Sequence, residues 1–277
     1  MKRLEYSLTN DILFKMYFVK HQYLLEILIA EFLDIPHSEI TQFQITNTEM
    51  LPEYVGDKFC KLDINMIVNE KRINLEIQVA DEGNYPERSL YHWAKMYSTA
   101  LGEGKDYAEL PETITINIID FVLFDCEEFH SEFHILEVSR HARLTDKFTK
   151  HFYELKKLPP LAREDKPKEL WLRLFKAKTE EDLENIKALE VPIMTQAIEA
   201  FGGVATSREF RELERMRSKA RHDEAQAIYT AERRGEERAN AKWKSVVVDV
   251  VAEKDAKISE KDARIAELEA QLNNRNV

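Results

Sequence analysis

Alternation of apolar and polar residues is clearest between positions 62 and 79. Nearly every second residue is apolar in 62–68 and again in 73–79, which is the period of a β-strand with one buried face. The short polar segment between the two runs predicts a β-hairpin. Its apolar face holds Leu62, Ile64, Met66, Val68, Ile73, Leu75, Ile77 and Val79, and its polar face holds Asp63, Asn65, Asn74, Glu76 and Gln78.

Helical and strand-like patterns alternate along the first half of the chain. Apolar residues three or four apart predict amphipathic helices, and continuous apolar runs predict strands that are covered on both sides. We therefore expect helices over 10–18, 23–33 and 86–101, a buried strand over 113–124, and weaker strands over 133–138 and 147–155. After the Pro159-Pro160 pair the pattern is helical throughout, with helices over 168–177, 180–189, 193–201 and 207–238.

The last part of the chain repeats with a period of seven residues. Segments 253–259, 260–266 and 267–273 read EKDAKIS, EKDARIA and ELEAQLN, and Val251, Ile258, Ile265 and Leu272 are seven residues apart. A seven-residue apolar repeat predicts a coiled coil. The second core position holds Lys254, Lys261 and Leu268, which weakens the seam, so a single solvated helix stays open as the alternative.

The polar face of the hairpin is the strongest candidate for chemistry. A two-residue turn pairs Asp63 directly with Glu76, whereas a four-residue loop pairs Asp63 with Gln78. Either register brings two carboxylates and a carboxamide together, with directly opposed Cβ atoms ~5 Å apart. Carboxylates this close repel unless a proton or a cation lies between them, and this set of groups suits a divalent ion such as Mg²⁺. The alternative is an ordinary solvent-exposed polar face.

Composition and charge limit the classes of protein that remain. Hydrophobic residues make up 44% and charged residues 33% of the 277 residues, and no apolar run reaches the ~18–20 residues of a membrane helix. The N-terminal segment lacks the apolar core of a signal peptide, and no GxxxxGK or GxGxxG motif is present, so we expect a cytoplasmic protein without a nucleotide-binding loop. The net charge is −11, and residues 1–207 carry 24 Lys and Arg against 36 Asp and Glu. This acidic balance argues against non-specific nucleic-acid binding.

Four short motifs, taken in their order and spacing, resemble those of one protein family. They are Asn10-Asp11-x-x-Phe14-Lys15, Leu62-Asp63-Ile64, Glu76-Ile77-Gln78, and Arg88 followed by Tyr91. With this pattern the chain resembles, from about residue 6 to about residue 235, the Rpn family of recombination-promoting nucleases and transposase-like proteins. That family belongs to the PD-(D/E)xK nuclease superfamily. The resemblance implies an α/β, restriction-endonuclease-like core with a C-terminal helical region.

The resemblance also implies a role for three residues of the hairpin. Asp63 and Glu76 correspond to the two metal-binding acids, with Mg²⁺ as the expected ion and Mn²⁺ or Ca²⁺ as alternatives. Gln78 stands where the superfamily usually has Lys. A glutamine can orient the attacking water but adds no positive charge near the phosphate. More of the electrostatic stabilisation would then come from the metal ion.

Arg88, on the helix after the hairpin, could supply the missing positive charge to a phosphate oxygen. Its alternative role is a surface ion pair with Glu82 or Glu87. Tyr91 lies about one turn further along the same helix, where we expect it to pack and count it only as a weaker candidate.

Three residues near the N-terminus are further weak candidates. Asp11 and Lys15 belong to the opening motif, although their four-residue spacing is also that of an ordinary surface pair on a helix. Glu26 is an acid on an otherwise apolar helix face. We expect any catalytic contribution from these residues to be secondary to that of the hairpin.

Together these expectations describe a metal-dependent DNA endonuclease that hydrolyses phosphodiester bonds and serves recombination, transposition or defence against foreign DNA. We expect a nuclease core over 1–158, a helical region over 159–244 and a coiled-coil tail over 245–277 that joins two chains in a homodimer. DNA is the expected partner, and a membrane is not. The alternative is a non-catalytic DNA-associated or assembly protein that oligomerises through the tail, which the acidic balance and the missing Lys keep open.

Overall fold

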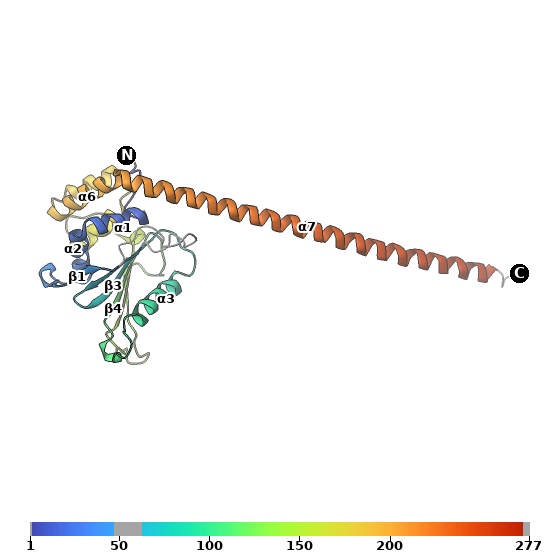
Figure 1. The fold of residues 1–277 in the computed structure, drawn as a ribbon, viewed down its shortest axis with the longest axis horizontal. Helices are drawn as coiled ribbons and strands as arrows, with labels where there is room; N and C mark the ends of the chain where they lie inside the picture. Colours follow the sequence, from blue (N-terminus) through green and yellow to red (C-terminus); the bar gives the residue numbers. More distant parts are fainter. Residues whose placement is uncertain (1, 47–62, 274–277) are drawn as a thin grey trace. The chain divides into compact units, whose positions relative to one another are not determined.

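A mixed sheet of six strands lies at the centre of the computed structural model, which describes residues 2–46 and 63–273 (Figure 1). The strand order is β1-β2-β3-β4-β6-β5. The β3–β4 and β4–β6 pairs are parallel and the other pairs are antiparallel. The strands are β1 (Phe43–Ile45), β2 (Ile64–Val68), β3 (Lys71–Gln78), β4 (Thr113–Ile119), β5 (His130–Phe133) and β6 (Phe148–Glu154).

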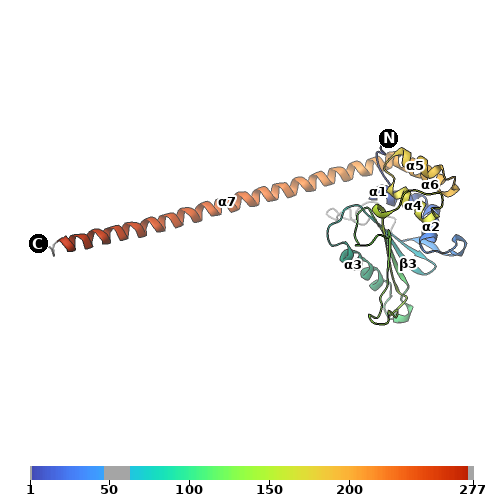
Figure 2. The same cartoon turned by 180° about the vertical axis from the view of Figure 1, so that it is seen from behind.

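Helices cover both faces of this sheet, as the two opposite views show (Figures 1 and 2). The first helix begins after Asn10, whose side chain accepts a hydrogen bond from the backbone N–H of Leu13 at 3.0 Å and caps the helix as expected. The helices are α1 (Asp11–Lys20), α2 (Gln22–Phe32), α3 (Tyr85–Ser98), α4 (Pro167–Lys176), α5 (Glu180–Lys187), α6 (Pro192–Ala205) and α7 (Arg208–Asn273), with 3₁₀ turns at His37–Glu39, Tyr107–Glu109 and Leu155–Lys157.

The β2–β3 hairpin has the two-residue turn that was one of the two predicted registers. Val68 pairs with Lys71, and Ile64 pairs with Leu75. Both turn residues, Asn69 and Glu70, have positive φ angles, 48° and 68°, as a type I′ turn requires. Because side chains alternate strictly along a strand, this turn decides which residues lie on each face of the sheet.

One face of the sheet is aliphatic and is buried under α1, α2 and α4–α6. Its strand residues and the apolar residues of these helices form one continuous hydrophobic cluster. Burial of this apolar surface is the main stabilising contribution that the fold can make. From the strands the cluster includes Ile64, Met66, Val68, Ile73, Leu75, Ile77, Ile114, Ile116, Ile118 and Tyr153.

The opposite face is covered by α3 and is mixed, because several buried polar side chains lie there beside a small apolar cluster of Tyr85, Ile119, Phe121 and Phe152. The indole N–H of Trp93 donates to the carbonyl oxygen of Thr113 at 2.9 Å, and the ring of Trp93 packs edge-on against Phe148 with centroids 4.6 Å apart. These contacts hold α3 over the parallel strands. The buried polar side chains on this face are Asn74, Glu76, Thr113, Thr115, Asn117 and Lys150.

Two strand predictions differ from the structure in extent, and one strand was missed. The strand expected over 113–124 ends at Ile119, and the weak strand expected over 133–138 is wrong, because β5 spans His130–Phe133. Only an isolated bridge from Leu136 to Arg143 lies in that predicted segment. The short edge strand β1 was not predicted, because three residues carry too little alternation to recognise.

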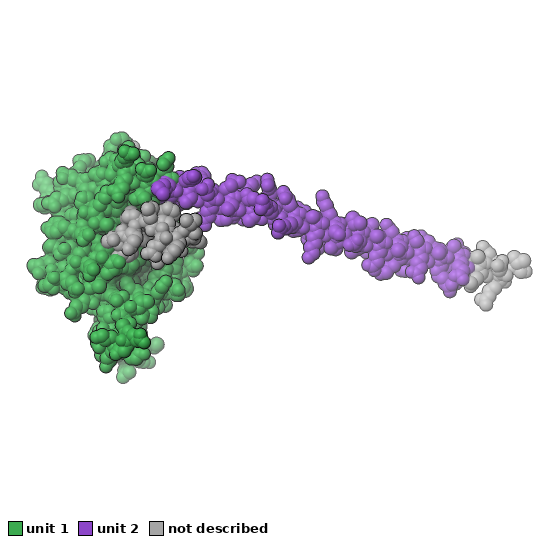
Figure 3. Space-filling view, in the orientation of Figure 1, with its two compact units in different colours: residues 1–215 green, residues 216–277 purple. Residues whose placement is uncertain are grey.

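The chain divides into two compact units, residues 1–215 and 216–277, which are coloured separately in Figure 3. In the second unit α7 is a continuous helix on which Val251, Ile258 and Ile265 are exposed; the side chain of Leu272 lies outside the described side chains. The coiled coil and the domain boundaries after 158 and 244 stay predictions. Among the described helices, none is both long and apolar enough to cross a membrane.

Candidate active site at the sheet face beneath α3

Adjacent strands and one helix bring the main predicted residues together. Glu76 and Gln78 project from the end of β3 on the polar face, and Asp63 directly precedes β2. Since Ile64 pairs with Leu75, the register carried one residue further puts Asp63 opposite Glu76. Arg88 comes from the first turns of α3, above the same face. The two-residue turn is therefore the local feature that assembles the acids.

Two amide side chains orient the carboxylate of Asp63. Its Oδ2 accepts hydrogen bonds from Asn65 Nδ2 at 2.9 Å and from Asn74 Nδ2 at 2.7 Å. The same Nδ2 of Asn74 also donates to Asn65 Oδ1 at 3.0 Å. Two short hydrogen bonds to one carboxylate oxygen fix the rotamer of the side chain. The asparagines of the polar face thus act as supports for the first acid.

Arg88 joins the second acid to the glutamine. Its Nη2 donates to Glu76 Oε1 at 3.1 Å and to Gln78 Oε1 at 2.8 Å, while its Nη1 donates to Glu82 Oε2 at 3.1 Å. The guanidinium carbon lies 5.2 Å from the ring centroid of Tyr85. The Glu82 pair was the alternative role for Arg88, and it coexists with contacts inside the predicted site.

Glu76 is the acid whose environment is most unusual for a charged group. Burial raises the pKa of the Glu76 carboxyl above its ordinary value, the nearby Arg88 charge acts against this shift, and the charge of Asp63 adds to it. A bound cation would offset the repulsion between these two acids and favour the charged form of both. The carboxylate oxygens of Asp63 and Glu76 are also the ligand type that Mg²⁺ and Mn²⁺ prefer.

Other polar residues beneath α3 were not predicted. Lys150, on β6, is buried and its Nζ donates to Ser89 Oγ at 2.8 Å. Burial lowers the pKa of the Lys150 ammonium to about 8, and the charge of Glu76 partly opposes this. Asn117 on β4 accepts from the Tyr85 hydroxyl at 3.1 Å. Little in the sequence indicated a role for Lys150, because the local pattern of its strand does not specify which strands lie beside it.

The weaker candidates lie elsewhere or stay predictions. Glu26, on α2, has its Oε1 3.0 Å from His37 Nε2, and α2 packs on the aliphatic face. Tyr91 is 65% exposed, so its expected packing is wrong. Lys15 is buried, so it does not lie at the surface as its alternative role required; Asp11 accepts the backbone N–H of Ile12 at 3.0 Å, and a catalytic role for either residue stays a prediction.

One acid lies directly before a strand of the mixed sheet, a second acid lies near the end of the neighbouring strand, and a helix covers this face. This arrangement is the one expected of the PD-(D/E)XK class of nuclease folds. Comparison with protein families matches the PD-(D/E)XK nuclease family transposase model over residues 8–231, and the chain belongs to this family. Comparison with curated proteins and with solved structures finds no match. The resemblance predicted from the motifs and the α/β fold are thereby confirmed, and the family supports a nuclease-like function.

Proposed function

We propose that the chain is a divalent-metal-dependent DNA endonuclease that acts in the cytoplasm, in recombination, transposition or defence against foreign DNA. The observation that carries the proposal is the convergence of Asp63, Glu76, Gln78 and Arg88 on one face, where Arg88 contacts both Glu76 and Gln78. An arrangement that needed only solubility would leave these polar groups in water. Here Glu76 is buried and Arg88 is largely covered; burying charged groups costs stability, and such groups cluster at functional sites.

Asp63 and Glu76 would hold the metal ion, for which Mg²⁺ is the first choice and Mn²⁺ or Ca²⁺ are alternatives. When bound there, a divalent cation would supply positive charge at the phosphate and lower the pKa of the attacking water. The two residues fit a divalent cation because both offer carboxylate oxygens. Glu76 is also buried close to the negative charge of Asp63.

Gln78 would orient the attacking water through its carboxamide. Its Nε2 donates to the carbonyl oxygen of Ala80 at 3.0 Å, and its Oε1 accepts from Arg88. A carbonyl oxygen has two lone pairs, so the Gln78 Oε1 keeps one to accept a hydrogen bond from water. Both ends of the amide are held, which fixes the direction of that remaining lone pair.

Arg88 and Lys150 would supply the positive charge that Gln78 lacks. The Nε of Arg88 is buried and has no hydrogen-bond partner among the residues that the structure describes. A buried N–H without a partner is costly, and a phosphate oxygen is a strong acceptor that would satisfy it. Lys150 contributes from beneath the same face, where its charge interacts with that of Glu76.

Cleavage of plasmid DNA in the presence of Mg²⁺, Mn²⁺ or Ca²⁺ tests the proposal. Asp63→Asn and Glu76→Gln are expected to reduce the rate by about 10²–10³-fold or more, while both proteins stay folded by circular dichroism. The matched controls Asp125→Asn and Glu164→Gln change exposed acids and should cut at the wild-type rate. Wild-type rates in both site variants would contradict the metal site, and an inactive wild type would favour the non-catalytic alternative.

The role of Gln78 has its own comparison. Gln78→Lys restores the superfamily's usual residue and is expected to retain cleavage, because a lysine can also orient water and adds charge. Gln78→Leu removes the lone pair and should lose much of the activity. Equal rates for these two variants would exclude Gln78 from the mechanism.

We also propose a homodimer to which the tail contributes. A nuclease that cuts both strands is served by two sites related by twofold symmetry. The exposed Val251, Ile258 and Ile265 lie seven residues apart on α7, and β-branched residues at such positions favour a parallel two-stranded coil. Sedimentation of the full chain and of a chain ending at Lys244 tests this: a monomer at micromolar concentration excludes the dimer, and an unchanged mass on truncation excludes the tail.

A further inference from the structure

Three potential metal ligands gather on the aliphatic face of the sheet, at its β5–β6 edge. His130 pairs with Tyr153, and Glu132 pairs with His151, in the antiparallel register of these strands. Since directly paired residues point to the same side, His130, Glu132 and His151 share one face. Lys150, the neighbour of His151, points to the other face beneath α3. This cluster is therefore separated by the sheet from the proposed nuclease site.

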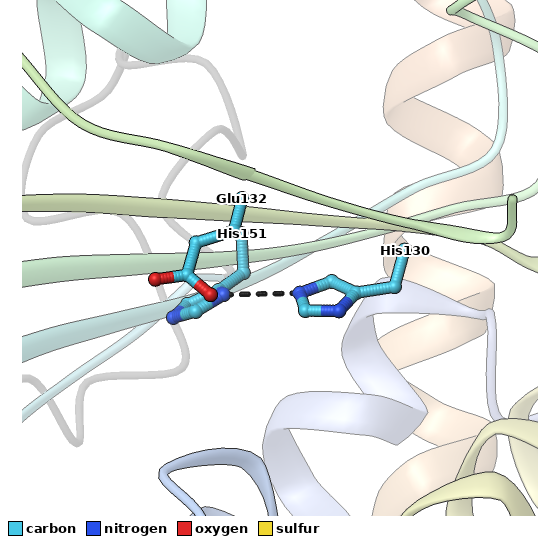
Figure 4. Close-up of side chains that lie close together, drawn as sticks. All are labelled: His130, Glu132 and His151. Carbon is cyan, nitrogen blue, oxygen red and sulfur yellow. Dashed lines mark hydrogen bonds between the residues drawn. The ribbon is translucent and has the colours of Figure 1, made fainter. Parts of the chain in front are cut away.

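The spacing of the three side chains is that of ligands around one ion. His130 Nε2 and His151 Nδ1 lie 3.1 Å apart, and one ligand atom from each of the three residues lies within 4.8 Å of the other two (Figure 4). Two nitrogens bound to a Zn²⁺ ion at ~2.0–2.1 Å with near-tetrahedral angles lie roughly 3.3 Å apart. The two rings now share one proton in a hydrogen bond, and a metal ion could take its place.

The ligands are also held in place by a surrounding set of contacts. His134 Nε2 donates to Glu132 Oε1 at 2.5 Å, while His134 Nδ1 lies 3.1 Å from the carbonyl oxygen of Phe148. The ring of His130 stacks on Tyr153 with centroids 4.4 Å apart and planes 6° apart. Hydrogen bonds and packing of this kind orient ligands in known metal sites and raise their affinity.

The protonation states suit metal binding. Burial lowers the pKa of His151 to about 4 and that of His130 below its usual value, so both rings are neutral near pH 7. Burial alone would raise the pKa of Glu132, but the hydrogen bond from His134 helps to hold it below its ordinary value, so this carboxylate is charged. Neutral imidazole and charged carboxylate are the forms that bind metals.

The cluster is open to an ion from a cavity of about 240 Å³, whose lining includes Glu132, His134 and His151. The positive charge of Lys168 lowers the pKa of both ligand histidines and would repel a cation. Its Nζ donates to both carboxylate oxygens of Asp34 at 2.8 Å, which offsets that repulsion.

We propose that His130, Glu132 and His151 bind a divalent transition-metal ion, with Zn²⁺ as its representative, at a second site distinct from Asp63 and Glu76. Two imidazoles and one carboxylate favour borderline ions such as Zn²⁺ over Mg²⁺, which prefers oxygen ligands alone. Three protein ligands leave a coordination position for water. The site joins the edge strand β5 to β6 through the ion and does not depend on the nuclease function proposed above.

Titration of the metal-stripped full-length protein with Zn²⁺, followed by calorimetry, tests the proposal. We expect one Zn²⁺ site whose affinity falls by more than about 100-fold in His130→Gln and in Glu132→Gln. His134→Gln changes a supporting residue and should lower the affinity less, by ~10–100-fold. Asp63→Asn and the exposed-histidine control His222→Gln should leave this site unchanged. Visible absorption of bound Co²⁺ gives a second readout, because its bands report nitrogen and oxygen coordination directly.

Folding is checked by circular dichroism, and Glu132→Gln keeps the test valid if His130→Gln fails to fold, because the Glu132 side chain is 45% exposed. Wild-type Zn²⁺ affinity in a folded Glu132→Gln protein and a folded His130→Gln protein would overturn the proposal. So would the absence of Zn²⁺ binding by the wild-type protein at micromolar concentration. Binding that is lost in Asp63→Asn instead would assign the ion to the nuclease site and overturn the second site.

Discussion

Neighbouring residues of β4 have opposite surroundings on the two faces of the sheet. Ile114, Ile116 and Ile118 lie in the aliphatic cluster with residues of the surrounding helices, whereas Thr115 and Asn117 lie beneath α3. All of these side chains are buried. Burying the isoleucines stabilises the fold, but burying amides, a carboxylate and an ammonium opposes it unless each is hydrogen-bonded.

A hydrogen-bond network satisfies most polar groups of this face, although the Nε of Arg88 has no partner among the described residues. Asn117 accepts from Tyr85 and donates to the carbonyl oxygen of His151 at 2.8 Å, and Arg88 contacts three acceptors. Such networks specify side-chain positions more than they add stability. Along β3 and β4, the residues that stabilise the fold and the residues of the candidate nuclease site therefore lie on different faces, so substitutions on the two faces should separate stability from DNA cleavage.

The largest expected effect on stability is on the aliphatic face. Ile116→Ala should lower the free energy of unfolding by about 2–5 kcal/mol, because a fully buried side chain leaves a cavity. Thr115→Val, one residue earlier and facing α3, should change it by less than about 1 kcal/mol, since it removes only a weak bond from Asn117 at 3.4 Å. Urea unfolding measures both changes, and equal losses of unfolding free energy would show that the two faces contribute equally to stability.

Lys150→Met should act in the opposite direction on stability. The lysine is buried with one hydroxyl partner, Ser89, which keeps a bond to the carbonyl oxygen of Pro86 when the ammonium is removed. An apolar side chain of similar length avoids the cost of burying charge, so the free energy of unfolding should rise by roughly 1–2 kcal/mol. DNA cleavage should fall in the same protein.

Unfolding and plasmid cleavage must both be measured for this variant, because the expectation is their divergence. Lys150→Arg keeps the charge and serves as the matched control. A less stable but fully active Lys150→Met protein would contradict the assignment of Lys150 to the chemistry of this face.

The sequence allowed the hairpin and its acids to be predicted but not the whole site. Asp63, Glu76 and Gln78 lie within one local alternating pattern, so their shared face follows from strand geometry alone. Lys150 reaches the same face only because β6 lies beside β4, and neither strand's local pattern specifies that neighbour. The same holds for His130 and His151, which lie close together only because β5 pairs with β6.

The helix α3 shows why a composition-based expectation failed for Tyr91. Aromatic neighbours suggested a buried position, but the side of α3 that faces the sheet is set by Tyr85, Ser89 and Trp93, which are four residues apart. Tyr91 lies off that line and is exposed. The period of the buried positions, rather than the number of aromatic residues, was the informative signal.

A smaller effect is expected from the contact between Arg88 and Gln78. A double-mutant cycle with Arg88→Met and Gln78→Leu should give a coupling free energy of about 1 kcal/mol, because the Nη2–Oε1 bond is short and the arginine is largely covered. The matched cycle with Glu82→Gln should give less than about 0.5 kcal/mol, since that carboxylate is 60% exposed. Urea unfolding supplies the values. A larger coupling free energy with Glu82 than with Gln78 would show that the main role of Arg88 is the surface ion pair.

The smallest expected effect lies in the turn that assigns residues to the two faces. Glu70 has a φ of 68°, which a residue with a Cβ adopts at a cost, whereas glycine adopts it freely. Its backbone N–H donates to Gln42 Oε1 at 3.1 Å, and a glycine keeps that bond. Glu70→Gly should therefore raise the free energy of unfolding by roughly 0.5–1 kcal/mol, after the greater freedom of glycine in the unfolded chain is subtracted.

The preceding turn residue provides the matched comparison for that substitution. Asn69 also has a positive φ, but its side chain accepts from the backbone N–H of Thr41 at 2.9 Å and donates to the carbonyl oxygen of Glu39 at 2.8 Å. Asn69→Gly loses these bonds and should be destabilising, and Glu70→Val should be more so because a β-branched residue is disfavoured at positive φ. If Glu70→Gly and Glu70→Val gave equal unfolding midpoints in urea, the left-handed turn could not be what holds Asp63 opposite Glu76.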